Sequence, residues 1–155
     1  MARKYHKGKF TPENPVKYAG NLDQIIYRSG YEKALMHWLD RNPNVLKWSS
    51  ESVCIPYTIQ TENKTRRYFP DFLIEILDKT GNKRILLIEV KPKKETVLPV
   101  VTRRKKKSTV IQEHVTYAKN QAKWEAARAW CKRHGAEFTI WTEDQLIELG
   151  VNIGR

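Results

Sequence analysis

The 155-residue sequence lacks the features that mark secreted, membrane-spanning or cysteine-ligated metal proteins. Its two cysteines, Cys54 and Cys131, form no CxxC pair, so we expect both thiols to stay reduced in the core. No apolar run approaches the roughly 20 residues that span a bilayer. The basic start MARKYHKGKF has no apolar segment behind it, as a secretory signal would. We therefore expect no membrane partner and a cytoplasmic location.

Acidic residues are scarce relative to basic ones. Lys and Arg number 29 against 17 Asp and Glu, which gives a net charge of +12 and a pI near 9.8. Such an excess favours a polyanionic partner, most commonly nucleic acid, although lysines can also simply keep a small protein soluble. The histidines form no ligand set, and no Ser-His-Asp arrangement is visible. We expect DNA as the partner and no small-molecule cofactor.

The apolar content of 40% is enough for one globular domain. Residues 1–24 are rich in Lys, Gly and Pro and show little hydrophobic periodicity. We therefore predict a basic N-terminal arm over 1–24, which binds DNA or protein, and a domain over 25–155.

Hydrophobic periodicity predicts the order helix, three strands, helix, strand, helix. The first helix begins at Ser29 and stops at Asn42-Pro43. The remaining predicted elements are strands over 45–59, with an interruption at Pro56, over 66–77 and over 84–90, a turn over 78–83, a helix over 110–134, a strand over 137–142 and a helix over 143–149. This order indicates an α/β domain built around a mixed central sheet with flanking helices.

Three charged residues stand at the ends of two apolar strands, where unpaired charge is costly to bury. In an antiparallel hairpin centred on Thr80 or Gly81, Asp71 lies opposite Glu89 or Lys91. Strand alternation puts Glu89 and Lys91 on one face. The sequence therefore predicts that Asp71, Glu89 and Lys91 converge at one end of the hairpin.

This cluster has a chemical use in phosphodiester hydrolysis. The carboxylates of Asp71 and Glu89, with the Val90 carbonyl, offer the hard oxygen ligands that Mg²⁺ prefers, and Mn²⁺ can take its place. The Lys91 ammonium can act on the attacking water or stabilise the charged phosphate. The alternative is a surface ion pair of Lys91 with Asp71 or Glu89 at a strand end.

The motifs FPDF, over 69–72, and IEVK, over 88–91, resemble the PD-(D/E)XK nuclease superfamily. The resemblance implies a restriction-endonuclease-like fold and a metal-dependent DNA endonuclease. It also implies that Glu32 joins the metal site, although Ser29 and Glu32 have the spacing of a helix capping box. A polar residue from the long helix often completes such sites. Gln121 is the best match, and a solvated helix face is its alternative reading.

Basic residues follow the predicted site in the sequence, and we expect them to bind the phosphates on either side of a scissile bond. They are Lys93, Lys94, Arg103, Arg104, Lys105, Lys106 and Lys107. No pattern for reading base edges stands out, so we expect no sequence specificity.

The segment ARKYHKGKFTPENPVKYAGN, followed by IIYRSGYE, resembles the head-completion proteins of large tailed bacteriophages. The resemblance implies a role in virion assembly after DNA packaging, portal or head proteins as partners, and a location in the host cytoplasm and in the virion. Two alternatives share the same sequence features. One is a non-catalytic DNA-binding head-completion or portal-sealing protein, and the other is a nuclease of the Holliday-junction or transposon-end type.

Overall fold

The computed structural model describes residues 7–154. Its helices are α1 (Gly30–Arg41), α2 (Lys107–His134) and α3 (Glu143–Glu148), with 3-10 turns η1 (Pro15–Lys17), η2 (Leu22–Gln24) and η3 (Lys93–Glu95). Its strands are β1 (Gly8–Lys9), β2 (Ile26–Tyr27), β3 (Val45–Ser50), β4 (Ile55–Ile59), β5 (Lys64–Tyr68), β6 (Phe72–Leu77), β7 (Lys83–Val90) and β8 (Glu137–Trp141).

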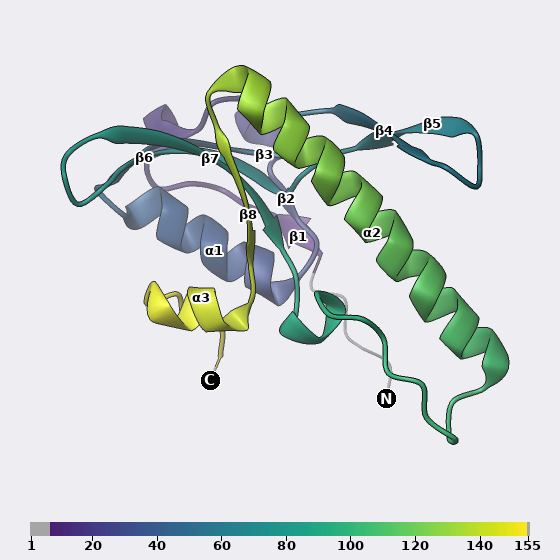
Figure 1. The fold of residues 1–155 in the computed structure, drawn as a ribbon. Coiled ribbons are helices and arrows are strands. Elements are labelled where there is room, and N and C mark those ends of the chain that lie inside the picture. Colours follow the sequence, from purple (N-terminus) through teal and green to yellow (C-terminus); the bar gives the residue numbers. More distant parts are fainter. Residues whose placement is uncertain (1–6, 155) are drawn as a thin grey trace.

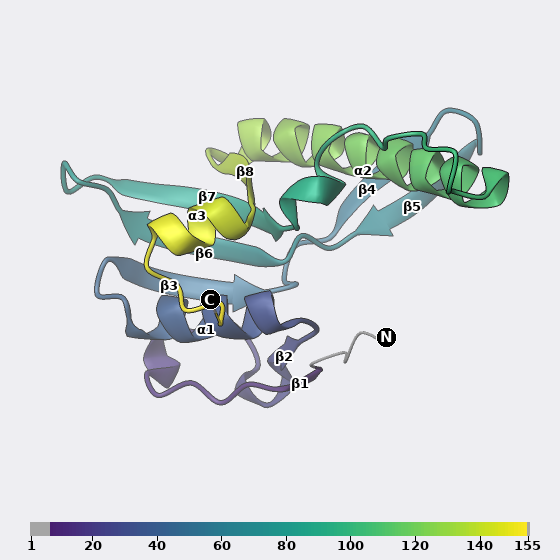
Figure 2. The ribbon, with the colours of Figure 1, turned by 90° about the horizontal axis from the view of Figure 1, so that it is seen from below.

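The central sheet has the strand order β3-β6-β7-β8. The pairs β3–β6 and β6–β7 are antiparallel, whereas β7 and β8 are parallel, so the sheet is mixed. Figures 1 and 2 show α1 and α2 on opposite sides of these strands. The predicted α/β architecture with a mixed central sheet and flanking helices is confirmed.

Strand β7 is buried on both faces because each face supports a separate apolar core. Leu86 and Ile88 join the core beneath α1 and α3, which includes Trp48 and Phe72. Leu87 points the other way and joins the core beneath α2. This explains why the strand is a continuous apolar run rather than an alternating one.

The helices begin and end close to the predicted positions. Ser29 caps α1 by accepting a hydrogen bond from the Glu32 backbone N–H, at 3.1 Å. Helix α2 begins at Lys107, three residues before the predicted start at Val110, and ends at His134, followed by the capping residue Gly135, whose φ of 65° suits glycine. Among residues 7–154, no helix is both long enough and apolar enough to cross a membrane.

A two-stranded hairpin, β4–β5, stands apart from the central sheet. The run over 45–59 is interrupted at 51–54, between β3 and β4, and not at Pro56, which lies within β4 and pairs with Arg67. A two-stranded ribbon tolerates proline, since a strand with only one neighbour needs ladder hydrogen bonds on one side. Cys54, just before the hairpin, is exposed, which corrects the expectation of a core position, whereas Cys131 is buried as expected.

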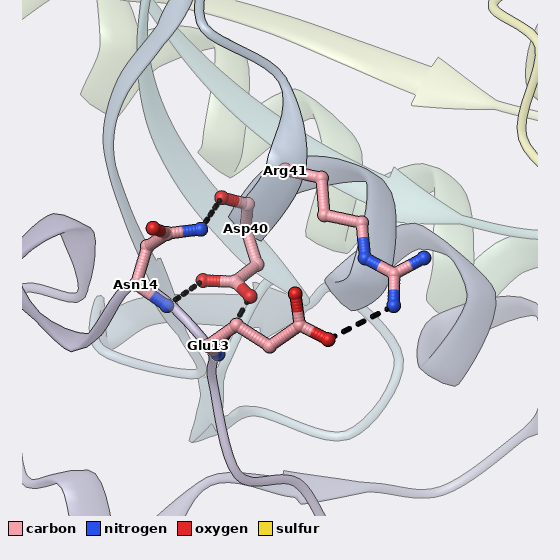
Figure 3. Close-up of polar contacts among 4 residues, drawn as sticks. All are labelled: Glu13, Asn14, Asp40 and Arg41. Atoms are coloured by element: carbon pink, nitrogen blue, oxygen red, sulfur yellow. Dashed lines mark hydrogen bonds and ion pairs between the residues drawn. The ribbon is translucent and has the colours of Figure 1, made fainter.

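The described part of the N-terminal segment packs onto the domain (Figure 3). The Asp40 carboxylate accepts the backbone N–H groups of Glu13, at 2.8 Å, and Asn14, at 3.0 Å. The Lys17 ammonium donates to three carbonyl oxygens at the end of α1, those of Leu39, Asp40 and Asn42. Residues 1–6 of the predicted arm lie outside the described residues.

Candidate active site

The open end of the β6–β7 hairpin holds the candidate site. Phe72 pairs with Ile88, and extending this register by one residue places Asp71 opposite Glu89. This is the pairing that a turn centred on Thr80 predicts. The hairpin therefore brings together two carboxylates that are 18 residues apart in the sequence.

Hydrogen bonds to the backbone fix Asp71 at this position. Its Oδ2 accepts the Val90 N–H at 2.7 Å, and its carbonyl accepts the Glu51 N–H at 3.0 Å. The first bond ties the carboxylate to the residue directly after Glu89. Neither bond engages Oδ1 of Asp71, so this oxygen remains open for another ligand.

Glu89 is 8% exposed and lies between a hydroxyl and an ammonium group. Its Oε2 accepts the Tyr68 hydroxyl at 2.5 Å, and its Oε1 is 3.9 Å from the Lys91 ammonium. The two carboxylate oxygens therefore face different partners. The ion pair of Lys91 with Glu89 is compatible with a site, because the Lys91 side chain is partly exposed.

Glu32 approaches the site from the first turn of α1. Its Oε2 accepts the Ser29 hydroxyl at 3.0 Å, and its backbone N–H donates to the same hydroxyl. Its side chain is buried, and its charge acts on both Asp71 and Glu89. Glu32 thus takes part in the capping interaction with Ser29 and also lies beside the other two carboxylates.

Burial and mutual repulsion raise the carboxylate pKa values. The pKa of Asp71 lies well above its ordinary value because of burial first, and then because of the negative charges of Glu89 and Glu32. Burial also raises the pKa of Glu89, against the opposing effects of the Tyr68 hydrogen bond and the Lys91 charge. Burial raises the pKa of Glu32 as well. A cation among these groups would relieve their repulsion.

The donor set suits a divalent cation that keeps part of its water shell. Within residues 7–154, no group of three or more Asp, Glu, His or Cys side chains is placed so that it could hold a metal ion. Mg²⁺ does not require such a group, because proteins usually hold it through one or two carboxylates together with water and substrate phosphates. Asp71 and Glu89 provide these two carboxylates beside a basic side chain, so the residues fit the ion.

Sequence reasoning missed several residues near the site. Tyr68 reaches Glu89 from strand β5, and the Lys123 ammonium lies 5.5 Å from the centre of the Tyr68 ring. The charge of Lys123 acts on Glu89. Arg28 and Glu51 form an ion pair at 2.9 Å, and both charges act on Glu32 or Asp71. No local pattern signals these contacts, because they join separate elements.

The other predicted site residues have more varied surroundings. Gln121 is half-buried on α2, and no recorded hydrogen bond joins it to the carboxylates. Lys93 pairs with Asp144 at 3.1 Å, and Lys105 pairs with Glu113 at 2.8 Å. The remaining basic residues of the segment are exposed and enter no recorded ion pair within the described chain: Lys94, Arg103, Arg104, Lys106 and Lys107.

Known proteins match most of the chain. Residues 42–143 match the family described as TnsA-like endonuclease N terminal. The chain is also 41% identical over 150 residues to a protein of Enterobacteria phage T4 described as head completion nuclease. That alignment covers 94% of this chain and 96% of the phage T4 protein. The family match includes Asp71, Glu89 and Lys91, and begins after Glu32.

Proposed function

The chain belongs to the TnsA-like endonuclease family, whose fold is restriction-endonuclease-like, and on this premise we propose that it is a divalent-metal-dependent DNA endonuclease. One observation carries the proposal. Asp71 and Glu89 meet at the end of the β6–β7 hairpin with the Lys91 ammonium beside them. This arrangement suits metal-assisted hydrolysis of a phosphodiester, which uses carboxylate ligands for a cation and a positive charge beside the phosphate.

Asp71 and Glu89 are the proposed ligands of Mg²⁺ or Mn²⁺, together with the Val90 carbonyl and Glu32. Asp71 is oriented by the Val90 N–H, and Glu89 is oriented by Tyr68. A bound divalent cation supplies charge neutralisation at the phosphate and lowers the pKa of a coordinated water.

Lys91 has the role of stabilising the reacting phosphate. In hydrolysis, a water molecule gives up a proton as its oxygen forms a bond to phosphorus, the bond from phosphorus to the leaving oxygen breaks, and that oxygen takes up a proton. Negative charge builds on the phosphate oxygens meanwhile, and a fixed ammonium lowers its energy. Lys91 lies on the same face as Glu89, and its side chain is partly exposed, so a phosphate can reach it. Gln121 is proposed to position the water or the phosphate.

DNA binding is proposed for the basic segment that follows the site. Lys94, Arg103, Arg104, Lys106 and Lys107 are exposed and suited to contact phosphates. Lys93 and Lys105 have acidic partners in the protein, which compete with DNA for their charges. Contacts to phosphates alone carry no sequence information, so the proposed cleavage is not sequence-specific.

The proposed biological role is processing of packaged DNA during head completion in a tailed bacteriophage. It is supported by the 41% identity to the head completion nuclease of phage T4. Portal or head proteins are the proposed partners, and the host cytoplasm and the virion are the proposed locations.

Cleavage assays with defined DNA shapes test this function. Purified protein is incubated with linear, circular and branched DNA, with Mg²⁺, with Mn²⁺ or with EDTA. We expect cutting of linear and circular duplexes that requires the metal. A preference for branched DNA would favour a junction or transposon-end nuclease, and binding without cutting would favour a structural head-completion protein.

Matched variants separate the proposed site from a contaminating nuclease. Asp71→Asn and Glu89→Gln should abolish cutting while DNA binding stays intact. Glu75→Gln is the control. Strand alternation places Glu75 of β6 on the same face as Asp71, but Glu75 forms its ion pair with Lys83. Normal cutting by both site variants would contradict the proposal.

A further inference from the structure

The β4–β5 hairpin is attached directly to the candidate active site. Strand β5 ends at Tyr68, which contacts Glu89, and the chain reaches Asp71 three residues later. Figures 1 and 2 show that the hairpin and the first turns of α2 extend beyond the same end of the central sheet. Two projections therefore extend beyond this end of the sheet, and only the one that follows β7 belongs to the DNA surface proposed above.

The hairpin carries exposed groups that suit phosphates. Arg67 pairs with Pro56, and Thr65 pairs with Thr58, so these residues share one face of the ribbon. All are exposed. Lys64 is exposed as well, at the tip of the hairpin, where it pairs with Ile59 on the other face of the ribbon. Among the described residues, neither Arg67 nor Lys64 enters a recorded ion pair, whereas Arg66 is paired with Glu62. Guanidinium, ammonium and hydroxyl groups are common donors to the DNA backbone.

The opposite face of the hairpin is rigidly supported. Ile55, Tyr57 and Tyr68 are buried against α2, in the core that contains Trp124 and Ala127. The Lys123 ammonium from α2 lies 5.9 Å from the Tyr57 ring centre and 5.5 Å from the Tyr68 ring centre. Tyr57 and Tyr68 are thus buried by packing and are not exposed for stacking on bases. The exposed face of the hairpin can instead contact the DNA backbone.

We propose that the β4–β5 hairpin is a second DNA-binding arm, which holds the duplex backbone on the side of the scissile phosphate opposite to the segment after β7. The proposal rests on the proposed nuclease function and specifies the form of its substrate. A duplex that continues on both sides of the cut engages both arms. The arm contributes binding energy at a distance from the reacting phosphate.

A charge-matched pair of variants tests the arm. Lys64→Gln/Arg67→Gln removes two exposed charges from the hairpin. Lys79→Gln/Lys132→Gln removes two exposed charges elsewhere, since Lys79 lies in the closed turn of the β6–β7 hairpin and Lys132 lies in the last turn of α2. Binding to a 30-base-pair duplex is measured in EDTA over a range of salt concentrations, and cleavage is measured with Mg²⁺.

The hairpin variant should bind about tenfold more weakly, with a salt slope reduced by about 1.8, because each phosphate contact contributes about 0.9. Its KM should rise while kcat at saturating DNA stays at the wild-type value. The control should match the wild-type slope. A hairpin variant with wild-type DNA affinity and a wild-type salt slope would contradict the proposed DNA-binding arm but not the proposed nuclease function. A wild-type protein that neither binds nor cuts duplex DNA would overturn both proposals.

Discussion

The Tyr68 hydroxyl donates a 2.5 Å hydrogen bond to Oε2 of Glu89, and both side chains are buried. The bond joins the β4–β5 hairpin to the end of β7. It leaves Oε1 of Glu89 facing the Lys91 ammonium. Tyr68 is therefore a positioning residue for a carboxylate that we expect to hold the metal.

Replacing Tyr68 tests this positioning role. Tyr68→Phe should weaken metal affinity or cleavage by about 10- to 100-fold, as is typical when the partner of a metal ligand is lost. The Mg²⁺ dependence of cleavage gives the measurement, because a purely structural defect would not move the metal concentration that gives half-maximal cutting. Tyr57→Phe is the control, since Tyr57 is buried on the same hairpin and its hydroxyl has no recorded hydrogen bond to a site residue. Equal Mg²⁺ dependence in both variants would argue against the role.

Removing the Asp71 charge should stabilise the metal-free protein. Because the pKa of Asp71 is raised on folding, the folded state holds the proton more tightly than the unfolded chain. The resulting stability is fully present below the unfolded pKa of about 3.9 and is lost as the pH rises through the folded pKa. In EDTA, Asp71→Asn should therefore have a higher Tm than wild type at pH 7, and the difference should shrink on acidification.

The amide in Asp71→Asn can still accept the Val90 N–H, so this variant keeps the backbone contact. Thermal melts in EDTA from pH 4 to pH 8 provide the measurement. Glu75→Gln is again the control and should show no such gain. A lower Tm for Asp71→Asn at neutral pH would show that the carboxylate stabilises the fold.

Divalent cations should reverse this order of stability. A cation present at about 100 times its Kd stabilises the native state by about 2.7 kcal/mol, which corresponds to a rise in Tm on the order of 5–10 °C. Wild type should show this rise with Mg²⁺ or Mn²⁺, whereas Asp71→Asn should not. NaCl at matched ionic strength separates binding from charge screening. Equal shifts in both proteins would place the metal elsewhere.

Lys91 should contribute to cleavage without contributing to metal affinity. Lys91→Met should reduce kcat by about 100- to 1000-fold, the loss typical of a group that stabilises transition-state charge. The rise in Tm with Mg²⁺ should remain in this variant. Lys79→Met is the control, because Lys79 is exposed in the closed turn of the β6–β7 hairpin, at the end away from the site. Loss of the Mg²⁺ effect in Lys91→Met would assign Lys91 to the assembly of the metal site instead.

Local sequence signals reduced the pairing of the proposed catalytic residues to two registers. A turn centred on Thr80 or Gly81 places Asp71 opposite Glu89 or Lys91, and the structure has the first of these registers. Ser29 and Gly135 likewise marked helix ends.

Contacts between distant segments were beyond sequence reasoning. Asp40 looks like an ordinary helix residue, yet its carboxylate is buried because residues 13 and 14 return to it. Tyr68 has the pattern of a strand residue, and only the placement of the hairpin against α2 and β7 reveals its hydroxyl as a partner of Glu89. Both depend on how separate elements pack in three dimensions.

The N-terminal segment also covers one edge of the central sheet. Strand β3 is an edge strand, and residues Tyr18 and Ala19 run beside it, with the Ala19 N–H donating to the Trp48 carbonyl at 2.9 Å. An edge strand that is left uncovered can pair with strands of other chains. Deleting the segment up to Gly20 would expose both the edge of β3 and the Asp40 carboxylate. The shortened protein should therefore aggregate through intermolecular strand pairing.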